Sequence, residues 1–356
     1  MAMAELSVLT INSGSSSLKA SLFSRDGSRK DYAYGRLDGQ EAAFERLIEE
    51  IDEKPDLIGH RFVHGGEIED AARLVSEAEL ERLKKLIPLA PLHLPGNIMG
   101  LEYCTRFGVP QVACFDTSFH STMPEASRKF PIPERFGIKR YGFHGLNYNY
   151  ISKQLPALLG DAAYGTIVAA HLGSGASLCL MENLKSVDTT MGYSPAGGIV
   201  MGTRSGDLDP GVMLALSKRM DHQALTRIVY HEMGLHALSG GESADMTDLL
   251  KSKSERAGFA IDFFCNSVRA TIGAYAAKAG GVDALVFSGG IGEHAPTIRE
   301  KICSPLEFMG FSLEDKANRL NLRKISGKHS RPILIVSADE ESVIRDLCLG
   351  FASRAA

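Results

Sequence analysis

The sequence lacks several features that mark whole classes of protein. Among its 356 residues, no apolar run approaches the ~20 residues that a membrane-spanning helix needs. The formal net charge of −4 leaves no basic excess, so we expect neither nucleic acid nor an anionic membrane as a partner. The segment MAMAELSVLTI has no basic residue before its apolar ones and is a poor export signal, which favours a cytoplasmic protein.

Closely spaced cysteines are also missing. The six cysteines are at least ten residues apart, and no CxxC pair occurs. This spacing argues against a zinc ribbon and against a dithiol redox site. We therefore interpret the cysteines as small buried hydrophobic residues.

Three common ligand-binding motifs fail on inspection. The only Gly-Lys pair, in KISGKHS (324–330), lacks the upstream glycine of a phosphate-binding P-loop. HLGSGASL (171–178) lacks the third glycine of a dinucleotide fingerprint. HEMGLH (231–236) spaces its histidines five apart, whereas a zinc-binding helix needs four.

The residues that are present indicate an α/β protein. A hydrophobic content of 44% and a charged content of 23% are typical of soluble globular chains, and the length favours two domains. A capping box of Ser76 and Glu79 predicts a helix over 76–87. Buried strands are predicted over 111–116 and 166–181, the second turning at its glycines, and strand-to-helix transitions over 283–294 and 331–341.

Two segments of the chain resemble each other. INSGSSSL (11–18) and HLGSGASL (171–178) align at an offset of 160 residues, and each predicts a hairpin with a Gly/Ser turn. An offset near half the chain length is what a duplicated domain gives. We expect one such hairpin in each domain, the two facing each other across a cleft.

Three glycine-rich turns follow predicted strands, at 12–17, 173–177 and 288–292. Backbone amides in such turns can surround phosphate oxygens. Alternatively, each turn only lets the strand reverse. Three such turns in a chain that also carries the arginines described next favour phosphate binding.

Two arginines stand in glycine-flanked segments, Arg204 in MGTRSGDLDPG (201–211) and Arg61 in GHRFVHGGE (59–67). A guanidinium held in such a loop can offer a planar fork to a phosphate or a carboxylate. For Arg204, an ion pair with Asp207 that only staples the loop is the alternative.

Polar residues also follow apolar segments, where α/β folds place ligands. Asp116 and His144 are such polar residues, and together with Phe143 they stand at the edges of apolar segments in FDTSFH and RYGFHG. The carboxylates of residues 339–341 close the last predicted strand. They could hold Mg²⁺ through oxygen ligands, or they could simply charge the first turn of a helix.

Taken in order, these motifs resemble the acetate kinase family, in the superfamily of sugar kinases, chaperone ATPases and actin. The resemblance covers nearly the whole chain: INSGSSSLK, GHRFVHGGE, PLHLPGN, FDTSFHSTMP, RYGFHG, HLGSGAS, SVDTTMGYSP, MGTRSGDLDPG, GGIGEH and ADEE. It implies two actin-like, ribonuclease H-like domains, each with a mixed five-stranded sheet flanked by helices, and a cleft between them. The implied domains are 1–146, with 342–356 packing back on it, and 147–341. A homodimer is also implied.

The resemblance further implies transfer of a phosphoryl group from ATP to acetate, with Mg²⁺ or Mn²⁺, giving ADP and acetyl phosphate. The residues it places at the site fall into four groups. Catalytic residues would be Arg61, Arg204, His144 and Asp116; the acyl group would meet Val63, Leu92, His93, Phe143 and Pro195; the metal would be linked to Asn12 and Glu340. The nucleotide and its phosphates would meet Ser15, Ser17, Lys19, His171, Gly173, Ser174, Gly175, Asp245, Met246, Gly290, Ile291 and His294.

The chain departs from the family pattern near the nucleotide. Ser174 and His294 stand where the family usually has asparagine, and Thr247 stands where an arginine is common. Acetate and propionate differ by one methylene, worth only ~1–3 kcal/mol in a pocket, so both stay open as substrates. A module that binds ATP and changes conformation without transfer is the alternative from another class.

Overall fold

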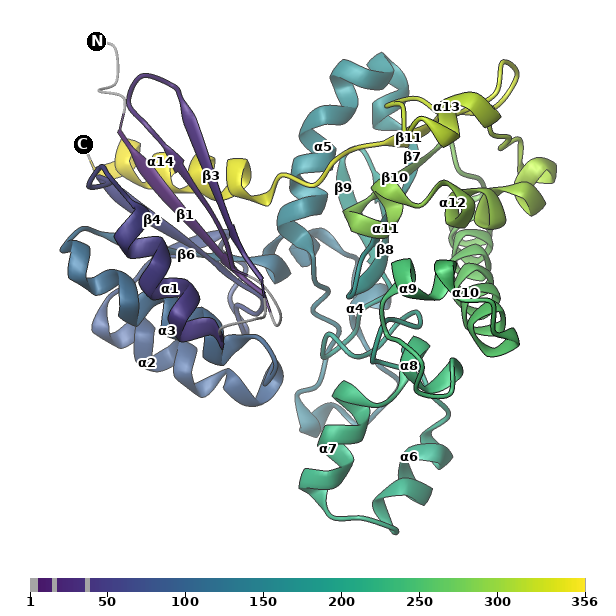
Figure 1. Cartoon of the computed structure of the whole chain (residues 1–356), viewed down its shortest axis with the longest axis horizontal. Coiled ribbons are helices and arrows are strands. Elements are labelled where there is room, and N and C mark those ends of the chain that lie inside the picture. Colours follow the sequence, from purple (N-terminus) through teal and green to yellow (C-terminus); the bar gives the residue numbers. More distant parts are fainter. Residues whose placement is uncertain (1–5, 15–17, 36–38, 356) are drawn as a thin grey trace. The chain divides into compact units, whose positions relative to one another are not determined.

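The computed structural model describes residues 6–14, 18–35 and 39–355 (Figure 1). Contacts along the chain divide it into two compact units. The first comprises Met1–Ser121, Phe143–Tyr150 and Asp339–Ala356, and the second comprises Thr122–Gly142 and Ile151–Ala338. The segment Thr122–Gly142, which the sequence analysis assigns to the N-terminal domain, thus packs with the second unit. The boundary expected at 146/147 falls inside helix α5 (Gly145–Leu159).

The first unit contains a six-stranded mixed sheet. Its strands are β1 (Val8–Ser13), β2 (Leu18–Phe23), β3 (Arg29–Tyr34), β4 (Leu57–Phe62), β5 (Ala72–Leu74) and β6 (Gln111–Phe115), in the spatial order β3-β2-β1-β4-β6-β5. β1, β4 and β6 are mutually parallel, and the other pairings are antiparallel. The sequence analysis expected five strands in this sheet, and the structure has six. The additional strand is β5, which pairs antiparallel with the edge of β6.

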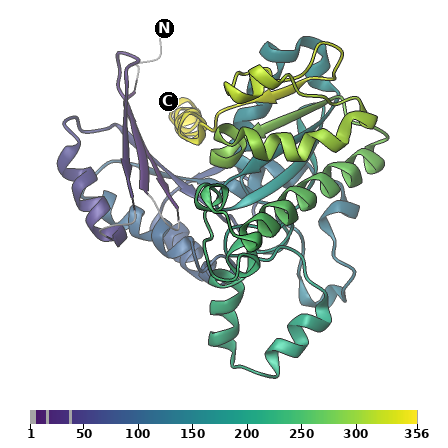
Figure 2. The same cartoon turned by 45° about the vertical axis from the view of Figure 1, so that its right-hand side comes forward.

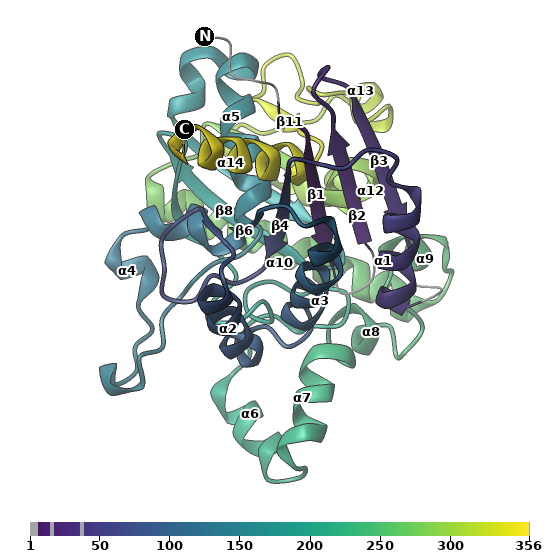
Figure 3. The same cartoon turned by 90° about the vertical axis from the view of Figure 1, so that its left-hand side faces the viewer.

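Helices cover both faces of this sheet. They are α1 (Gly39–Glu50), α2 (Glu77–Lys85), α3 (Leu94–Cys104) and α14 (Glu340–Ala355). Leu9 and Ile11 of β1 share a core with Phe44 of α1, whereas Val8 shares one with Ile344 of α14. Successive side chains of a strand point to opposite faces, so β1 has an α1 face and an α14 face. Figure 3 shows α14 lying across the strands.

The second unit contains a five-stranded mixed sheet in the order β11-β10-β7-β8-β9. Its strands are β7 (Thr166–Leu172), β8 (Ala176–Glu182), β9 (Lys185–Thr189), β10 (Ala284–Ser288) and β11 (Ile333–Ile335). Its helices are α4 (Glu125–Arg128), α6 (Pro210–Ser217), α7 (His222–His231), α8 (Gly234–Leu238), α9 (Met246–Lys251), α10 (Glu255–Ala279), α11 (Gly289–His294), α12 (Pro296–Cys303) and α13 (Asp315–Arg319). The long helix α10 packs on β7 and β8 and is seen end to end in Figure 2.

The two sheets share one plan. In each, an antiparallel hairpin (β1–β2 or β7–β8) continues into a further antiparallel strand on one side and into parallel strands on the other. Removing β5 leaves the same order in both. The two similar Gly/Ser segments therefore occupy equivalent hairpins, as a duplicated domain predicts.

Local predictions are confirmed at several points. Ser76 caps α2 by accepting a hydrogen bond from the backbone N–H of Glu79 (3.2 Å). β10 runs into α11 through the glycine turn, and α14 follows the last strand. HEMGLH is split between α7 and α8, so it forms no single metal-binding helix. Within the described residues, no helix combines the length and apolarity needed to cross a membrane.

Candidate active site

Three polar residues meet at one edge of the first sheet because of strand register. Ile11 pairs with His60, and Phe62 pairs with Phe115. Asn12, Arg61 and Asp116 therefore lie at the carboxyl ends of three parallel strands.

The alternation of side chains places all three on the α14 face. Each of them comes an even number of residues after a position on the α14 side of its strand. These positions are Val8 and Cys114, which belong to the core shared with α14, and Gly59, where a side chain would meet Ile344 and Cys348. The sheet thus gathers residues more than 100 positions apart.

Arg61 is held from three directions. Its Nε and Nη2 both donate to Oδ2 of Asp116, at 3.0 and 2.7 Å. Its Nη1 donates to Oδ1 of Asn12 (3.0 Å) and lies 3.4 Å from Oε2 of Glu340. Only 13% of the Arg61 side chain is exposed, so its direction is fixed by the protein rather than by solvent.

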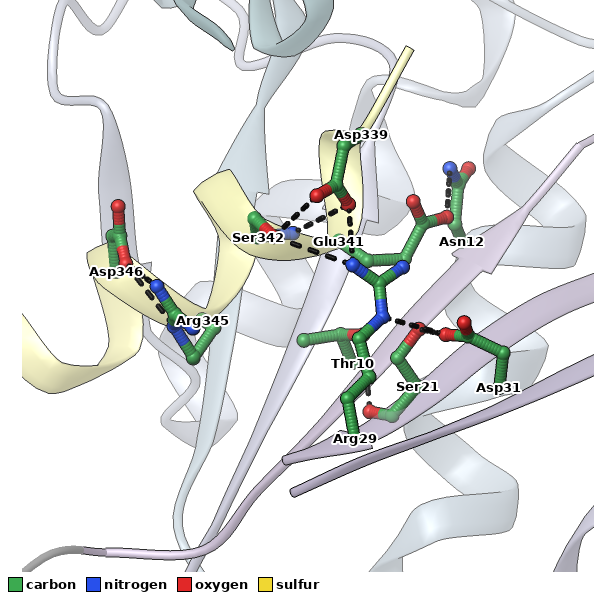
Figure 4. A network of polar contacts seen from close by, with 10 residues as sticks. All are labelled: Thr10, Asn12, Ser21, Arg29, Asp31, Asp339, Glu341, Ser342, Arg345 and Asp346. Carbon is green, nitrogen blue, oxygen red and sulfur yellow. Dashed lines mark hydrogen bonds and ion pairs between the residues drawn. The ribbon is translucent and has the colours of Figure 1, made fainter. Parts of the chain in front are cut away.

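Helix α14 contributes two carboxylates to the same place. Nδ2 of Asn12 donates to Oε2 of Glu340 (2.7 Å) and to Oε1 of Glu341 (3.1 Å). Figure 4 draws the contact between Asn12 and Glu341. We call Asn12, Arg61, Asp116, Glu340 and Glu341 the Arg61 cluster. Asn12 joins Arg61 to α14, because its Oδ1 accepts from Arg61 while its Nδ2 donates to the two glutamates of the helix.

The Arg61 cluster holds an excess of negative charge. Burial raises the pKa of Asp116 to about 6; Arg61 opposes this shift and Glu340 adds to it. Burial also raises the pKa of Glu341, with a further contribution from Glu340. With all three carboxylates ionised, one guanidinium would leave two negative charges (three minus one). A divalent cation with a preference for oxygen ligands fits that donor set.

The described residues form no complete set of metal ligands by themselves. Within these ranges, the Arg61 cluster included, no three His, Cys, Asp or Glu side chains are grouped so as to hold a metal ion. Mg²⁺ usually keeps several waters and takes one or two carboxylates together with substrate phosphates. Glu340 suits that role. Because the Asn12 oxygen already accepts from Arg61, Asn12 suits the orientation of Glu340.

His144 lies beside Asp116 in a strained conformation. Its φ of 57° is in the left-handed region, which few residues other than glycine adopt. The next residue, Gly145, packs so closely on the Asp116 carbonyl that a Cβ there would lie 1.9 Å from the oxygen. The N–H of Leu146 reaches Oδ1 of Asp116 (3.4 Å). The start of α5 is therefore locked onto Asp116.

The residues expected around the acyl group belong to both units. In the first unit, Val63 and Phe143 are buried, whereas Leu92 and His93 are half-buried in the turn before α3. The ring of Phe143 packs edge-on against His64 at 5.6 Å. Pro195 belongs to the second unit. Their joint role as a pocket stays a prediction.

Arg204, in the second unit, is buried without an anionic partner among the described residues. It is 6% exposed, and its Nη1 donates to the carbonyl of Pro195. Its Nε is buried and makes no hydrogen bond to any residue that the structure describes. Burial lowers the pKa of Arg204 to about 10, and Tyr230 opposes part of the shift. The Asp207 alternative is wrong, since Oδ1 of Asp207 accepts from the N–H of Gly198 (2.8 Å).

The loop that carries Arg204 is joined to the β7–β8 turn. The N–H of Gly202 donates to the carbonyl of Ser174 (3.2 Å). A Cβ at Gly202 would lie 2.9 Å from the carbonyl of Ala244, the residue before Asp245. Three segments predicted to bind phosphate or nucleotide are thus in contact at Gly202.

The other predicted nucleotide residues lie in the second unit at the ends of strands and helices. His171 is near the end of β7, and the turn that follows is closed by a hydrogen bond from the N–H of Gly173 to the carbonyl of Gly175 (3.1 Å). Gly290, Ile291 and His294 belong to α11. Asp245 caps α9, accepting from the N–H of Thr247 (2.7 Å), and Met246 is buried. Capping gives Asp245 a structural role as well.

Of the residues near the N-terminus that were predicted to bind phosphate, the structure describes only Lys19. Ser15 and Ser17 lie outside the described residues. Lys19 is exposed and pairs with Asn12 across the hairpin. Its charge lowers the pKa of Glu341, opposing the effect of burial.

Two residues of the site were not singled out from the sequence. The sequence analysis treated Glu341 together with Asp339 and Glu340. Only the structure shows that Glu341 contacts Asn12 whereas Asp339 contacts Arg29. Asn97 joins the two sides of the site region, since its Oδ1 accepts from the N–H of Val63 (3.3 Å) and its Nδ2 donates to the carbonyl of Ser13 (2.9 Å). The sequence feature that could have identified Asn97 is its position as the last residue of the motif PLHLPGN.

Comparisons with known proteins identify the family to which the chain belongs. The profile of the Acetokinase family matches residues 36–346. A curated acetate kinase of Nitrobacter hamburgensis is 37% identical over 95% of this chain and 94% of its own length. A propionate kinase of Citrobacter rodentium is 41% identical over 81% of this chain and 74% of its own length.

A solved structure is similar over nearly the whole length. The propionate kinase of Francisella tularensis matches with a TM-score of 0.88 and 32% identity, covering 97% of this chain and 99% of its own. The chain belongs to the Acetokinase family.

Proposed function

We propose that this protein is an acetate kinase, which transfers the γ-phosphoryl group of ATP reversibly to acetate and gives acetyl phosphate and ADP. Its relatives are named acetate kinases over 95% of the chain. The observation that carries the chemistry is the Arg61 cluster, in which one arginine is fixed beside buried carboxylates in excess.

The reaction needs charge neutralisation more than proton transfer. A carboxylic acid with a pKa near ~4.3, judged from glutamate, is ionised at neutral pH, so the acceptor needs no general base. An acetate oxygen forms a bond to Pγ while the bond from Pγ to the β,γ-bridging oxygen breaks, and that oxygen keeps the electron pair. No proton moves. Bound Mg²⁺ supplies positive charge to the phosphate oxygens.

We assign the two arginines to the anionic oxygens. Arg61 is oriented by Asp116 and Asn12, and Arg204 has an Nε–H that no acceptor in the described part of the chain uses. Preorganised donors of this kind stabilise charge that develops in a transition state. Asp116 is then the residue that orients Arg61, and His144 completes the site beside it.

Trapping of acyl phosphate with hydroxylamine tests the proposal. The purified chain is incubated with ATP, Mg²⁺ and acetate, propionate or butyrate, and acyl hydroxamate is measured. We expect the largest kcat/KM with acetate. A preference for propionate would make the protein a propionate kinase, the name of one relative. No hydroxamate from any acid, together with ATP binding, would instead favour a conformational module.

Direct in-line transfer has its own test. Incubation with ATP labelled in the γ-phosphoryl group, without acetate, should leave no label on the protein after gel filtration. A labelled protein that passes its phosphoryl group to acetate at the rate of turnover would disprove direct transfer.

We also propose a cytoplasmic homodimer. The charged substrates ATP and acetate suit a cytoplasmic location, and Phe259 and Phe263 of α10 are large apolar side chains that are 57% and 46% exposed. Light scattering of the purified chain should give twice the monomer mass of 38.5 kDa. A monomer mass at micromolar concentration would contradict the dimer.

A further inference from the structure

Arg29 of β3 reaches the start of α14. Its Nη1 donates to Oδ1 of Asp339 (2.9 Å) and contacts Oγ of Ser342 (3.4 Å). Its Nε donates to Oδ1 of Asp31 (2.7 Å), and Asp31 in turn accepts from Oγ of Ser21 (2.5 Å). Figure 4 shows the guanidinium lying between the strand residues and the first turn of the helix.

Asp339 is also the residue that caps α14. Its Oδ1 accepts from the N–H of Ser342 (3.2 Å), three residues further on, and its Oδ2 accepts from Oγ of Ser342 (2.5 Å). This is the pattern of an N-cap side chain, which satisfies an otherwise unpaired N–H of the first turn. One carboxylate therefore joins the capped helix end to β3.

The next two residues are the ones that face the Arg61 cluster. Glu340 and Glu341 accept from Nδ2 of Asn12, and Glu340 lies 3.4 Å from Arg61. Neighbouring residues at the start of a helix move together, because their carbonyl groups are hydrogen-bonded to N–H groups of the next turn. A shift or rotation at Asp339 must therefore displace Glu340.

We propose that Arg29 and Asp339 are positioning residues that fix the first turn of α14 and thereby place Glu340 for the divalent metal ion. This inference rests on the proposed function, in which Glu340 is the metal carboxylate. The Arg29–Asp339 pair is not part of the Arg61 cluster and is linked to it through the first turn of α14. Of the three consecutive acidic residues, Asp339 thus caps the helix, whereas Glu340 and Glu341 belong to the Arg61 cluster.

The test compares Arg29→Gln with Arg345→Gln. Arg345 is the matched control, because its guanidinium stacks on the ring of Phe23 at 4.9 Å, as that of Arg29 does at 5.1 Å. Its ion pair is with Asp346 within α14, away from Asp339. The side chains of Arg29 and Arg345 are 31% and 37% exposed, so both variants should fold.

The main measurement is metal binding rather than turnover. Mn²⁺ binding is followed by the EPR signal of the free ion, with ADP present at saturation. We expect Arg29→Gln to weaken Mn²⁺ binding on the order of 10-fold, as loss of a residue that orients a metal ligand does. Arg345→Gln should bind Mn²⁺ within about twofold of the wild type by the same reasoning.

A second measurement follows the helix itself. Hydrogen exchange of the amides of residues 341–344 in the metal-free protein should speed up in Arg29→Gln and not in Arg345→Gln. Asp339→Asn, which keeps the shape of the cap but loses the charge, should weaken Mn²⁺ binding as Arg29→Gln does.

The outcomes separate this inference from the function on which it rests. If the wild type binds no Mn²⁺ with ADP, the proposed metal site fails. If the wild type binds Mn²⁺ and Arg29→Gln binds it equally well with unchanged exchange, the positioning role is overturned while the function stands. Equal weakening in both arginine variants would also overturn it, because stacking on Phe23 would then explain the effect.

Discussion

Arg61 of the first unit and Arg204 of the second unit have opposite electrostatic surroundings. Arg61 lies among carboxylates, which raise its pKa although burial opposes them. Arg204 is buried without a carboxylate among the described residues, and burial lowers its pKa to about 10. A buried cation without a counter-ion is costly unless a ligand supplies the charge. Arg204 is therefore the residue whose environment points most directly to an anionic substrate.

Substitution of Arg204 should separate function from stability. We expect Arg204→Ala to lower kcat about 10²–10⁴-fold, the usual loss for a group that stabilises transferring phosphoryl charge. Its melting temperature should change little, because removal of an uncompensated buried charge offsets the cavity left behind. Hydroxamate rates and thermal unfolding check this, with the exposed Arg219→Ala as control. A collapse in stability would support a structural loop instead.

Asp116 offers a test of orientation against base catalysis. Its pKa is raised to about 6, chiefly by burial, so the carboxylate loses its charge as the pH falls through that value. We expect wild-type kcat/KM to decline below about pH 6, because a neutral Asp116 holds Arg61 less firmly. Asp116→Asn should lose roughly 10²-fold in rate and show no such acid limb.

The measurement is the pH profile of kcat/KM between pH 5 and 8 for both proteins. If Asp116 were a general base, the activity lost in Asp116→Asn could be recovered in part by raising the pH. Rescue of Asp116→Asn at high pH would therefore count against the orienting role.

At the scale of single elements, β4 shows how one strand serves two purposes. Arg61 points to the α14 face and the site, and its neighbour His60 points to the α1 face and the core. His60 is buried and contacts Oε1 of Gln111 through its Nε2 (2.7 Å). Burial lowers the pKa of His60 to about 4. The strand carries a permanent cation on one face and a neutral imidazole on the other.

The low pKa of His60 predicts acid sensitivity. The unfolded chain takes up a proton near pH 6.5, whereas the folded chain resists protonation until about pH 4. The contribution of His60 to stability is thus complete above pH 6.5 and is lost as the pH falls towards 4. Between pH 7 and 4.5 the free energy of unfolding should fall by about 2–3 kcal/mol from this group alone.

Urea unfolding at several pH values checks the effect of His60. His60→Gln should lack this part of the pH slope, whatever its stability at pH 7. His222→Gln, at an exposed position, should keep the wild-type slope. Equal slopes in all three proteins would show that His60 does not titrate as expected.

At the scale of the whole molecule, all six cysteines are free and buried. Burial raises the pKa of Cys104, Cys179, Cys265 and Cys303 to about 12 each. The thiolate is the reactive form, so the native protein should react very slowly with a thiol reagent such as DTNB. In guanidinium chloride, six thiols per chain should react. Rapid reaction of a native thiol would contradict their structural role.

The fold was largely predictable because its signals are local. Alternation of strands and helices, the cap at Ser76 and the paired hairpins at 11–18 and 171–178 all depend on neighbouring residues. The extra strand β5 was missed because three residues give no period that a pattern can detect. Its pairing with β6 depends on a partner some 40 residues away.

The sequence by itself determined the family, the α/β class and the residue types that carry charge, since these follow from motifs and local periodicity. The tertiary structure decided which of those charges meet. Parallel register brings Asn12, Arg61 and Asp116 to one edge, and the turn of α14 sends Glu340 and Glu341 to that edge while Asp339 goes to Arg29. Such choices depend on pairings between distant segments, and no stretch of neighbouring residues contains them.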